Sequence, residues 1–475
     1  GNMCIMHNFT RNNLFLAVLA LLTFVSSLLL PSTTRLLHPD SSGYIDFFEF
    51  RTSFYPVFLD IFSYFGLSIE QIPIVQVLIF SLSLYYLLRS LSNMCIKKIS
   101  IFLYVVALVG NIWFISLHKA ILTESLYISL NIIAVSSLIN FLFNGHIKHL
   151  FLFSLTIGLA MGVRPSGVAL VALMPIILLS AYIRFKKFNW SWIAVLIVPL
   201  FLTQIAERGL HYKYHGKINR TSIMDPIIFG KGAMIEGSFQ YSGPYKNILE
   251  EYSSEVDLEF REVRSFIEKI PFFWLKNQSL PNYELYAQFQ LLRNRHDFYA
   301  EKASVSKHEI MRELGKQRIY NGIDQLIKNS LYYYAGSWGL RVTTFPYFVK
   351  EYNEWALEQS KIPKNSAIPY LPLKGELESS IVSMIAFPGL LLAGVISGLI
   401  GIIFLIMLLL RREIPLYFML SGILSVSVHG MLFFYSFVNI ATPRYTIAQF
   451  PILLLVFFFF FLWVSPVVKK WIKTI

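Results

Sequence analysis

The chain has 475 residues, of which 55% are hydrophobic and only 15% are charged, whereas about 25% of residues are charged in ordinary soluble domains. This composition, with a mean hydropathy of +0.56, excludes a soluble globular protein and indicates an integral membrane protein. The net charge of +13 does not indicate a nucleic-acid partner, because the sequence has no basic stripe with interleaved aromatic residues.

Apolar stretches long enough to cross a bilayer, which takes about 20 helical residues, predict a polytopic all-α protein. The ten candidate spans are residues 12–31, 73–92, 99–117, 120–143, 149–163, 166–183, 190–206, 381–410, 415–437 and 445–467. We therefore expect an N-terminal membrane bundle of about seven spans over 1–206 and a C-terminal membrane segment of three spans over 381–475. Between them, residues 207–380 are expected to form a mainly helical hydrophilic domain.

Within that hydrophilic domain, apolar residues recur at near-helical spacing from 247 to 270. A second helical region is expected from 283 to about 334, with a break at Asn321-Gly322. The domain is therefore expected to be built from amphipathic helices.

Basic residues set the expected orientation, because Lys and Arg near span ends stay on the cytoplasmic side. One side of the ten-span arrangement carries 13 of them, at positions 11, 89, 97, 98, 148, 184, 186, 187, 411, 412, 469, 470 and 473. The short connections on the other side carry only five, namely Arg35, Arg51, Lys119, Arg164 and Arg444. We expect a protein of the cytoplasmic membrane with both termini in the cytoplasm and the domain 207–380 outside.

The first outer connection, residues 32–72, places acidic, basic and aromatic residues at the membrane surface. Asp40 can take a proton from a hydroxyl, Arg51 can hold a phosphate, and Tyr44 lies between them in the sequence. Residues 44–50 mix three phenylalanines with two acids, as expected of a helix lying in the membrane interface. The alternative role for Asp40 is the N-cap of that helix.

Three further outer connections each supply an ionisable group. Glu124 stands at the edge of the fourth span, where a carboxylate is costly and therefore a functional candidate; alternatively it pairs with Lys119 and faces water. Arg164 precedes a proline in a sharp turn and either binds a phosphate or extends to the lipid headgroups. Arg444 and Tyr445 precede the last span and are either site residues or interfacial anchors.

Two motifs in and beside the hydrophilic domain have a chemical and a structural interpretation. The segment 332–341, with Trp338 and Arg341, can stack on a sugar ring or pack the domain onto the membrane. His211 and His215 have a spacing that can hold a metal on a helix face, but no third ligand stands nearby. We expect no required cofactor; a divalent metal is possible, but the first loop has no Asp-X-Asp motif to hold one.

Five short motifs carry a family resemblance through their order and their shared side of the membrane. They are Pro39-Asp40-Ser41 with Tyr44, Tyr55-Pro56-Val57-Phe58-Leu59, Thr123-Glu124-Ser125-Leu126, Arg164-Pro165 and Pro443-Arg444-Tyr445. Together they resemble the GT-C superfamily of polyprenyl-phosphate-sugar-dependent glycosyltransferases, including protein O-mannosyltransferases, the lipid A aminoarabinose transferase and O-antigen-modifying enzymes. One departure is Ser41, which stands where the family has a second acid; Asp46 and Glu49 are the candidates to replace it.

The resemblance implies a GT-C-like bundle that transfers a sugar, with inversion, from a polyprenyl (undecaprenyl) phosphate donor to a hydroxyl of a cell-envelope glycan or glycolipid. It implies Asp40 as the catalytic base and Glu124 as a second acid. The residues then expected at the lipid phosphate are Arg51, Lys119, Arg164 and Arg444, and those expected at the sugar or acceptor are Tyr44, Tyr445, Trp338 and Arg341. The alternatives are an O-antigen polymerase or ligase, a secondary transporter, and an O-acyltransferase that uses His429.

Overall fold

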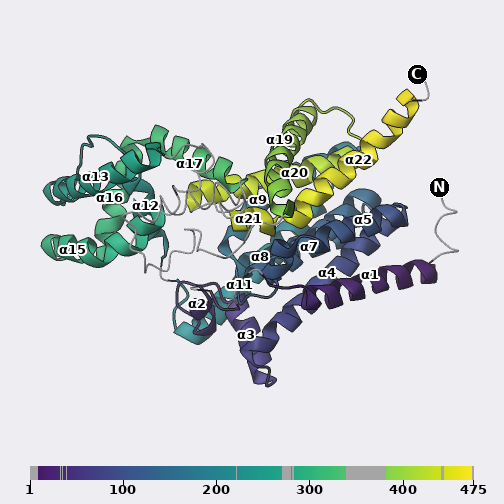
Figure 1. Cartoon of the computed structure of the whole chain (residues 1–475), viewed down its shortest axis with the longest axis horizontal. Coiled ribbons are helices and arrows are strands. Elements are labelled where there is room, and N and C mark those ends of the chain that lie inside the picture. Colours follow the sequence, from purple (N-terminus) through teal and green to yellow (C-terminus); the bar gives the residue numbers. More distant parts are fainter. Residues whose placement is uncertain are drawn as a thin grey trace. The chain divides into compact units, whose positions relative to one another are not determined.

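The computed structural model describes residues 9–32, 34, 36–38, 40–220, 222–269, 280, 283–338, 381–439 and 443–472. Across these residues every regular element is a helix and none is a strand (Figure 1), which confirms the expected all-α class. The chain divides into two compact units. Unit 1 comprises Gly1–Arg220, Val395–Met431 and Ile447–Ile475, and unit 2 comprises Thr221–Gly394 and Leu432–Thr446.

Six helices in the described part of the chain are long and apolar enough to cross a membrane. They cover Ile69–Asn93, Glu124–Asn144, Pro165–Phe185, Ser191–His215, Gly389–Leu409 and Leu416–Val438. Four shorter apolar helices, Asn13–Leu29, Lys98–Val109, Ile147–Val163 and Phe450–Pro466, fall in the other four expected ranges. The protein is therefore a polytopic membrane protein, while the count of ten spans stays a prediction.

Unit 1 is a helical bundle in which neighbouring helices approach closely. Its helices are α1 (Phe9–Leu29), α2 (Ser41–Ile45), α3 (Phe54–Tyr64), α4 (Ile72–Asn93), α5 (Lys98–Val109), α6 (Ile112–Leu117), α7 (Glu124–Asn144), α8 (Ile147–Val163), α9 (Val168–Val171), α10 (Met174–Phe185), α11 (Ser191–His215) and α22 (Phe450–Ile472), with the 3₁₀ turns η2 (Ile69–Gln71) and η3 (Pro165–Gly167). Helix α7 packs against α4 and α8, and α8 packs against α11. A Cβ at Gly158 of α8 would overlap Thr203 of α11, so glycine permits this approach.

Helix-breaking residues shift several of the expected boundaries. The range 99–117 divides at Gly110 into α5 and α6, and the side chain of Asn111 caps α6 by accepting the N–H of Phe114 at 3.1 Å. Helix α11 does not end at residue 206 but continues to His215, where Gly216 adopts the left-handed conformation with φ +67°. The expected domain boundary at 207 therefore lies inside a helix, and unit 2 begins at residue 221.

Unit 2 contains the amphipathic helices expected from the sequence, including the break after Asn321. Its helices are α12 (Met224–Ala233), α13 (Lys246–Lys269), the π-helical η4 (Ala287–His296), α15 (Asp297–Ala303), α16 (Lys307–Asn321) and α17 (Ile323–Ser337). The helices α19 (Ile381–Leu409), α20 (Leu416–Val438) and α21 (Pro443–Ala448) contribute residues to both units. Helix α12 packs on α16, where a Cβ at Gly232 would lie 2.8 Å from the Cα of Gly315.

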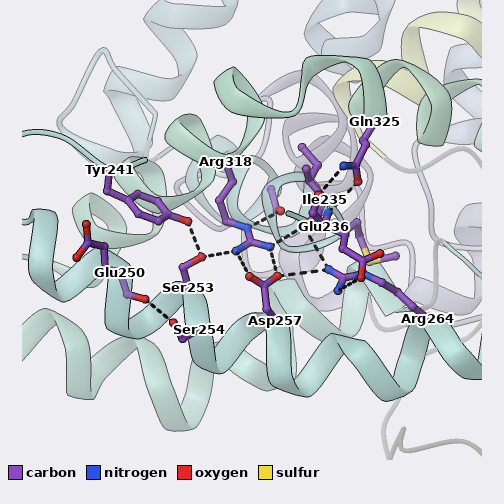
Figure 2. Close-up of polar contacts among 12 residues, drawn as sticks. Ile235, Glu236, Tyr241, Glu250, Ser253, Ser254, Asp257, Arg264, Arg318 and Gln325 are labelled. Carbon is purple, nitrogen blue, oxygen red and sulfur yellow. Dashed lines mark hydrogen bonds and ion pairs between the residues drawn. The ribbon is translucent and has the colours of Figure 1, made fainter. Parts of the chain in front are cut away.

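A buried guanidinium fastens three helices of unit 2 together (Figure 2). Arg318 of α16 is fully buried and pairs with Asp257 of α13, with Nη2 2.7 Å from Oδ1. It also donates to the carbonyls of Gly232 and Ile235 at the end of α12, at 2.9 and 2.6 Å. Gly232 lies in the last turn of α12 and Ile235 just after its end, so the guanidinium fixes the C-terminal end of this helix. Arg318 therefore serves the packing of unit 2.

Candidate functional site

The first loop, residues 32–72, folds so that Asp40 and Arg51 meet. Helix α2 begins directly after Asp40, and Nη2 of Arg51 lies 2.9 Å from Oδ1 of Asp40. Asp40 occupies the N-cap position, but its side chain accepts no capping hydrogen bond. The Asp40 side chain is 46% exposed and that of Arg51 is 19% exposed. The Asp40 carboxylate therefore pairs with Arg51 instead of capping α2, and it is accessible to solvent.

The guanidinium of Arg51 is held by aromatic rings and by a glycine. Its Nη1 donates to the hydroxyl of Tyr44 at 2.9 Å, and its Cζ lies 4.2 Å from the centre of the Tyr44 ring and 5.0 Å from that of Phe50. A Cβ at Gly43 would lie 2.9 Å from Nε, so a side chain there would displace the guanidinium. A guanidinium has five N–H donors, and the bonds to Asp40 and Tyr44 engage two of them.

A second, buried ion pair joins Glu124 and Arg164, with Oε1 3.0 Å from Nη1 and side-chain exposures of 2% and 12%. Glu124 is the first residue of α7 and Arg164 follows the last residue of α8, so two adjacent helix ends bring them together. Lys119, the partner of Glu124 in the alternative interpretation, instead donates to the main-chain carbonyls of Leu28 and Leu30. The interpretation in which Glu124 pairs with Lys119 and faces water is therefore wrong.

Tyr44 lies within electrostatic range of both ion pairs. Burial raises the pKa of the Tyr44 phenol; Arg51 opposes this rise, Asp40 and Glu124 add to it, and Arg164 opposes it. The phenol therefore keeps its proton at neutral pH and can act as a hydrogen-bond donor. The four charged groups that the sequence predicts on three separate connections thus all act electrostatically on one buried tyrosine.

Hydrogen bonds to neighbouring connections hold the first loop on both sides of Arg51. Ser41 Oγ donates to the carbonyl of Ile121, before α7, at 2.8 Å. Thr52 Oγ1 donates to the carbonyl of Val163, the last residue of α8, at 2.8 Å. Three of the four outer connections expected to converge are therefore joined by direct hydrogen bonds in unit 1.

The remaining expected site residues belong to unit 2. Arg444 and Tyr445 lie in its segment Leu432–Thr446, where Tyr445 stacks on Tyr435 with ring centres 4.2 Å apart. Trp338 follows α17 and is only 5% exposed, which favours packing over stacking on a sugar. Arg341 lies outside the described residues.

The two histidines considered for metal binding have other contacts. The rings of His211 and His215 lie 4.6 Å apart. Both ring nitrogens of His211 face main-chain carbonyls, with Nδ1 2.8 Å from Lys217 O and Nε2 2.9 Å from Glu49 O. Among the residues that the structure describes, no group of three or more His, Cys, Asp or Glu side chains is placed to hold a metal ion.

Sequence reasoning missed Glu207, which lies one turn before His211 on α11 and is fully buried. Its carboxylate accepts the main-chain N–H of Ser53 at 3.1 Å and Nη2 of Arg220 at 2.9 Å. The expected span ended one residue earlier, at Ala206, so Glu207 was assigned to the hydrophilic domain. The helical spacing of Glu207 relative to the apolar residues before it is the sequence feature that could have predicted its place on this helix.

No protein family, no curated protein and no solved structure matches the chain. The chemistry of the site in unit 1 is therefore the ground on which a function can be assigned.

Proposed function

We propose that the protein transfers a sugar from a polyprenyl (undecaprenyl) phosphate donor to a hydroxyl of a cell-envelope glycan or glycolipid, of the O-antigen or lipopolysaccharide type. The observation that carries the proposal is the solvent-reachable carboxylate of Asp40, fixed 2.9 Å from the guanidinium of Arg51. A carboxylate can accept the proton of an attacking hydroxyl, and a neighbouring guanidinium can stabilise a departing phosphate. A displacement at a sugar phosphate needs a base for the attacking hydroxyl and a cation for the leaving phosphate, and Asp40 and Arg51 can supply these two groups.

In the proposed reaction the acceptor oxygen attacks C1 of the sugar from the side opposite the phosphate, which inverts C1. The new C1–O bond forms while the C1–phosphate bond breaks, and the electron pair of that bond leaves with the polyprenyl phosphate. Asp40 takes the hydroxyl proton, and Arg51 neutralises the leaving group. Arg164, held by Glu124, supplies the second cation, and Lys119 is a further candidate at the phosphate.

Asp40→Asn tests this assignment. Because Asp40 makes no capping bond and is 46% exposed, the free energy of unfolding should change by less than about 1 kcal/mol. If Asp40 is the general base, release of polyprenyl phosphate by the purified protein should fall about 10²–10⁴-fold, measured with a panel of undecaprenyl-phosphate hexoses.

Asp60→Asn is the matched control, because Asp60 is another exposed first-loop carboxylate, bonded to the hydroxyl of Tyr214 at 2.8 Å. This variant should keep wild-type turnover. Wild-type turnover in a folded Asp40→Asn protein would remove Asp40 from the site. It would also turn attention to an O-antigen polymerase or ligase, which does not need this base.

The proposal places the site at the extracytoplasmic face of the cytoplasmic membrane, and cysteine labelling tests this. Cys95 is exposed and follows α4, and Glu301 is exposed on α15. In a Cys4→Ser background, an impermeant maleimide added to intact cells should label Glu301→Cys and leave Cys95 unlabelled. Labelling of both or of neither would contradict the expected orientation.

A further inference from the structure

Two side chains one turn apart on α11 hold the main chain on either side of Arg51. Glu207 and His211 are four residues apart and therefore share a helix face. His211 Nε2 lies 2.9 Å from the carbonyl of Glu49, two residues before Arg51. Glu207 Oε1 accepts the N–H of Ser53, two residues after Arg51, at 3.1 Å. We call Glu207 and His211 the α11 clamp.

The Glu207 half of the clamp is a buried carboxylate that needs its donors. Its side chain is 0% exposed, and it accepts hydrogen bonds from Ser53 N and Ser53 Oγ, both at 3.1 Å, and from Arg220 at 2.9 Å. Ser53 is the N-cap residue of α3, so the negative charge also faces the positive end of that helix. Because a buried charge without donors is costly, the carboxylate and the start of α3 stay together.

The His211 half of the clamp contacts two acceptors. Carbonyl oxygens only accept hydrogen bonds, and a neutral imidazole has one N–H. Each tautomer of the neutral ring therefore donates to one of the two carbonyls, Lys217 O or Glu49 O. The ring of His211 also contacts the rings of His215 and Phe47, with ring centres 4.6 and 6.1 Å away.

We propose that the α11 clamp positions the guanidinium of Arg51 and thereby sets the affinity of the site for a lipid phosphate. Between its two anchor points the chain has only Phe50, Arg51 and Thr52, and Thr52 is itself bonded to Val163 O at 2.8 Å. A segment this short, fixed at both ends, directs the arginine toward Asp40. The link to the lipid phosphate rests on the proposed function, whereas the positioning of Arg51 does not.

Hydrogen–deuterium exchange of the full-length protein tests the positioning without any substrate. Glu207→Ala should raise amide exchange in residues 49–53 about tenfold or more, because the N–H of Ser53 loses its acceptor. Glu207→Gln keeps an acceptor oxygen and should restore most of the protection. Exchange in α7 should stay unchanged in both variants. Glu70→Ala, at an exposed first-loop carboxylate, is the matched control and should change neither region.

Binding of undecaprenyl phosphate in nanodiscs, with neutral undecaprenol as reference, tests the link to the phosphate. Glu207→Ala and His211→Gln should each weaken binding of the phosphate about tenfold and leave binding of undecaprenol unchanged. If the clamp acts through Arg51, Glu207→Ala should cause no further loss in an Arg51→Ala background, since coupled residues are not additive. A purely structural role would give losses that add.

Additive losses, or unchanged exchange of residues 49–53 in the Glu207→Ala protein, would overturn the inference. Should Glu207→Ala not fold, His211→Gln carries the same comparison. A wild-type protein that binds undecaprenyl phosphate no better than undecaprenol would refute the proposed function. The exchange measurement would then still decide whether the clamp positions Arg51.

Discussion

The ion pair between Glu124 and Arg164 should stabilise unit 1 only as a pair. At an effective dielectric constant of about 20, unit charges at their N–O distance of 3.0 Å attract by about 5–6 kcal/mol. Much of this attraction offsets the loss of hydration of two side chains that are only 2% and 12% exposed. Removing the arginine alone leaves a buried carboxylate without its counter-charge, which should lower the free energy of unfolding by about 3–5 kcal/mol.

Thermal unfolding of purified variants in one detergent measures this effect. Arg164→Met should lower the unfolding midpoint by at least about 5 °C, and the double variant Glu124→Gln with Arg164→Met should recover most of that loss because no charge stays buried. Lys186→Met breaks an ion pair with Glu413 whose side chains are 67% and 85% exposed, and should change stability little. An Arg164→Met protein as stable as the wild type, or a double variant whose loss equals the sum of the single losses, would refute the reasoning.

Two further outcomes are expected. Gly43→Ala should weaken polyprenyl phosphate binding about tenfold or more, because the new Cβ would lie 2.9 Å from Nε of Arg51, whereas Gly209→Ala, with open space around it, should bind normally. Burial lowers the pKa of His296, whose Nδ1 lies 2.6 Å from the Tyr252 hydroxyl, from 6.5 to about 3. At low pH the unfolded chain binds a proton at His296 that the folded chain does not. The contribution of His296 to the free energy of unfolding is therefore fully present above about pH 6.5. Below that pH it falls by about 1.4 kcal/mol per pH unit. His296→Gln should flatten this dependence in thermal unfolding between pH 6.5 and 4.5, and an unchanged slope would contradict it.

The helical ranges could be predicted because an apolar run sets both the type and the approximate length of a membrane helix. Residues 124–144 and 416–438 illustrate this, since each contains an apolar stretch long enough to cross a membrane. Helix ends were predicted less well where polar residues continue the helix, as from Glu207 to His215. There the composition resembles a loop, and only Gly216 marks the end.

The candidate residues of the site could be named from the sequence one by one, but their pairing could not be predicted. Asp40 and Arg51 were recognisable as an acid and a base in one short loop. Their contact, however, depends on the absence of a side chain at Gly43, which spacing does not reveal. Likewise, Glu124 and Arg164 meet because the ends of α7 and α8 lie together. A single sequence does not state which helix ends are neighbours.

Unit 2 is completed by residues that the ribosome makes late. Lys231 is 5% exposed, pairs with Glu284 at 3.4 Å and donates to the carbonyl of Ser436 on α20 at 3.0 Å. Ser436 follows Lys231 by 205 residues, which corresponds to about 10–40 s of synthesis. Until then the buried amine lacks one of its acceptors. Unit 2 can therefore complete its folding only after α20 has been translated. A chain truncated before this helix would have an incompletely packed unit 2, which quality-control proteases can recognise.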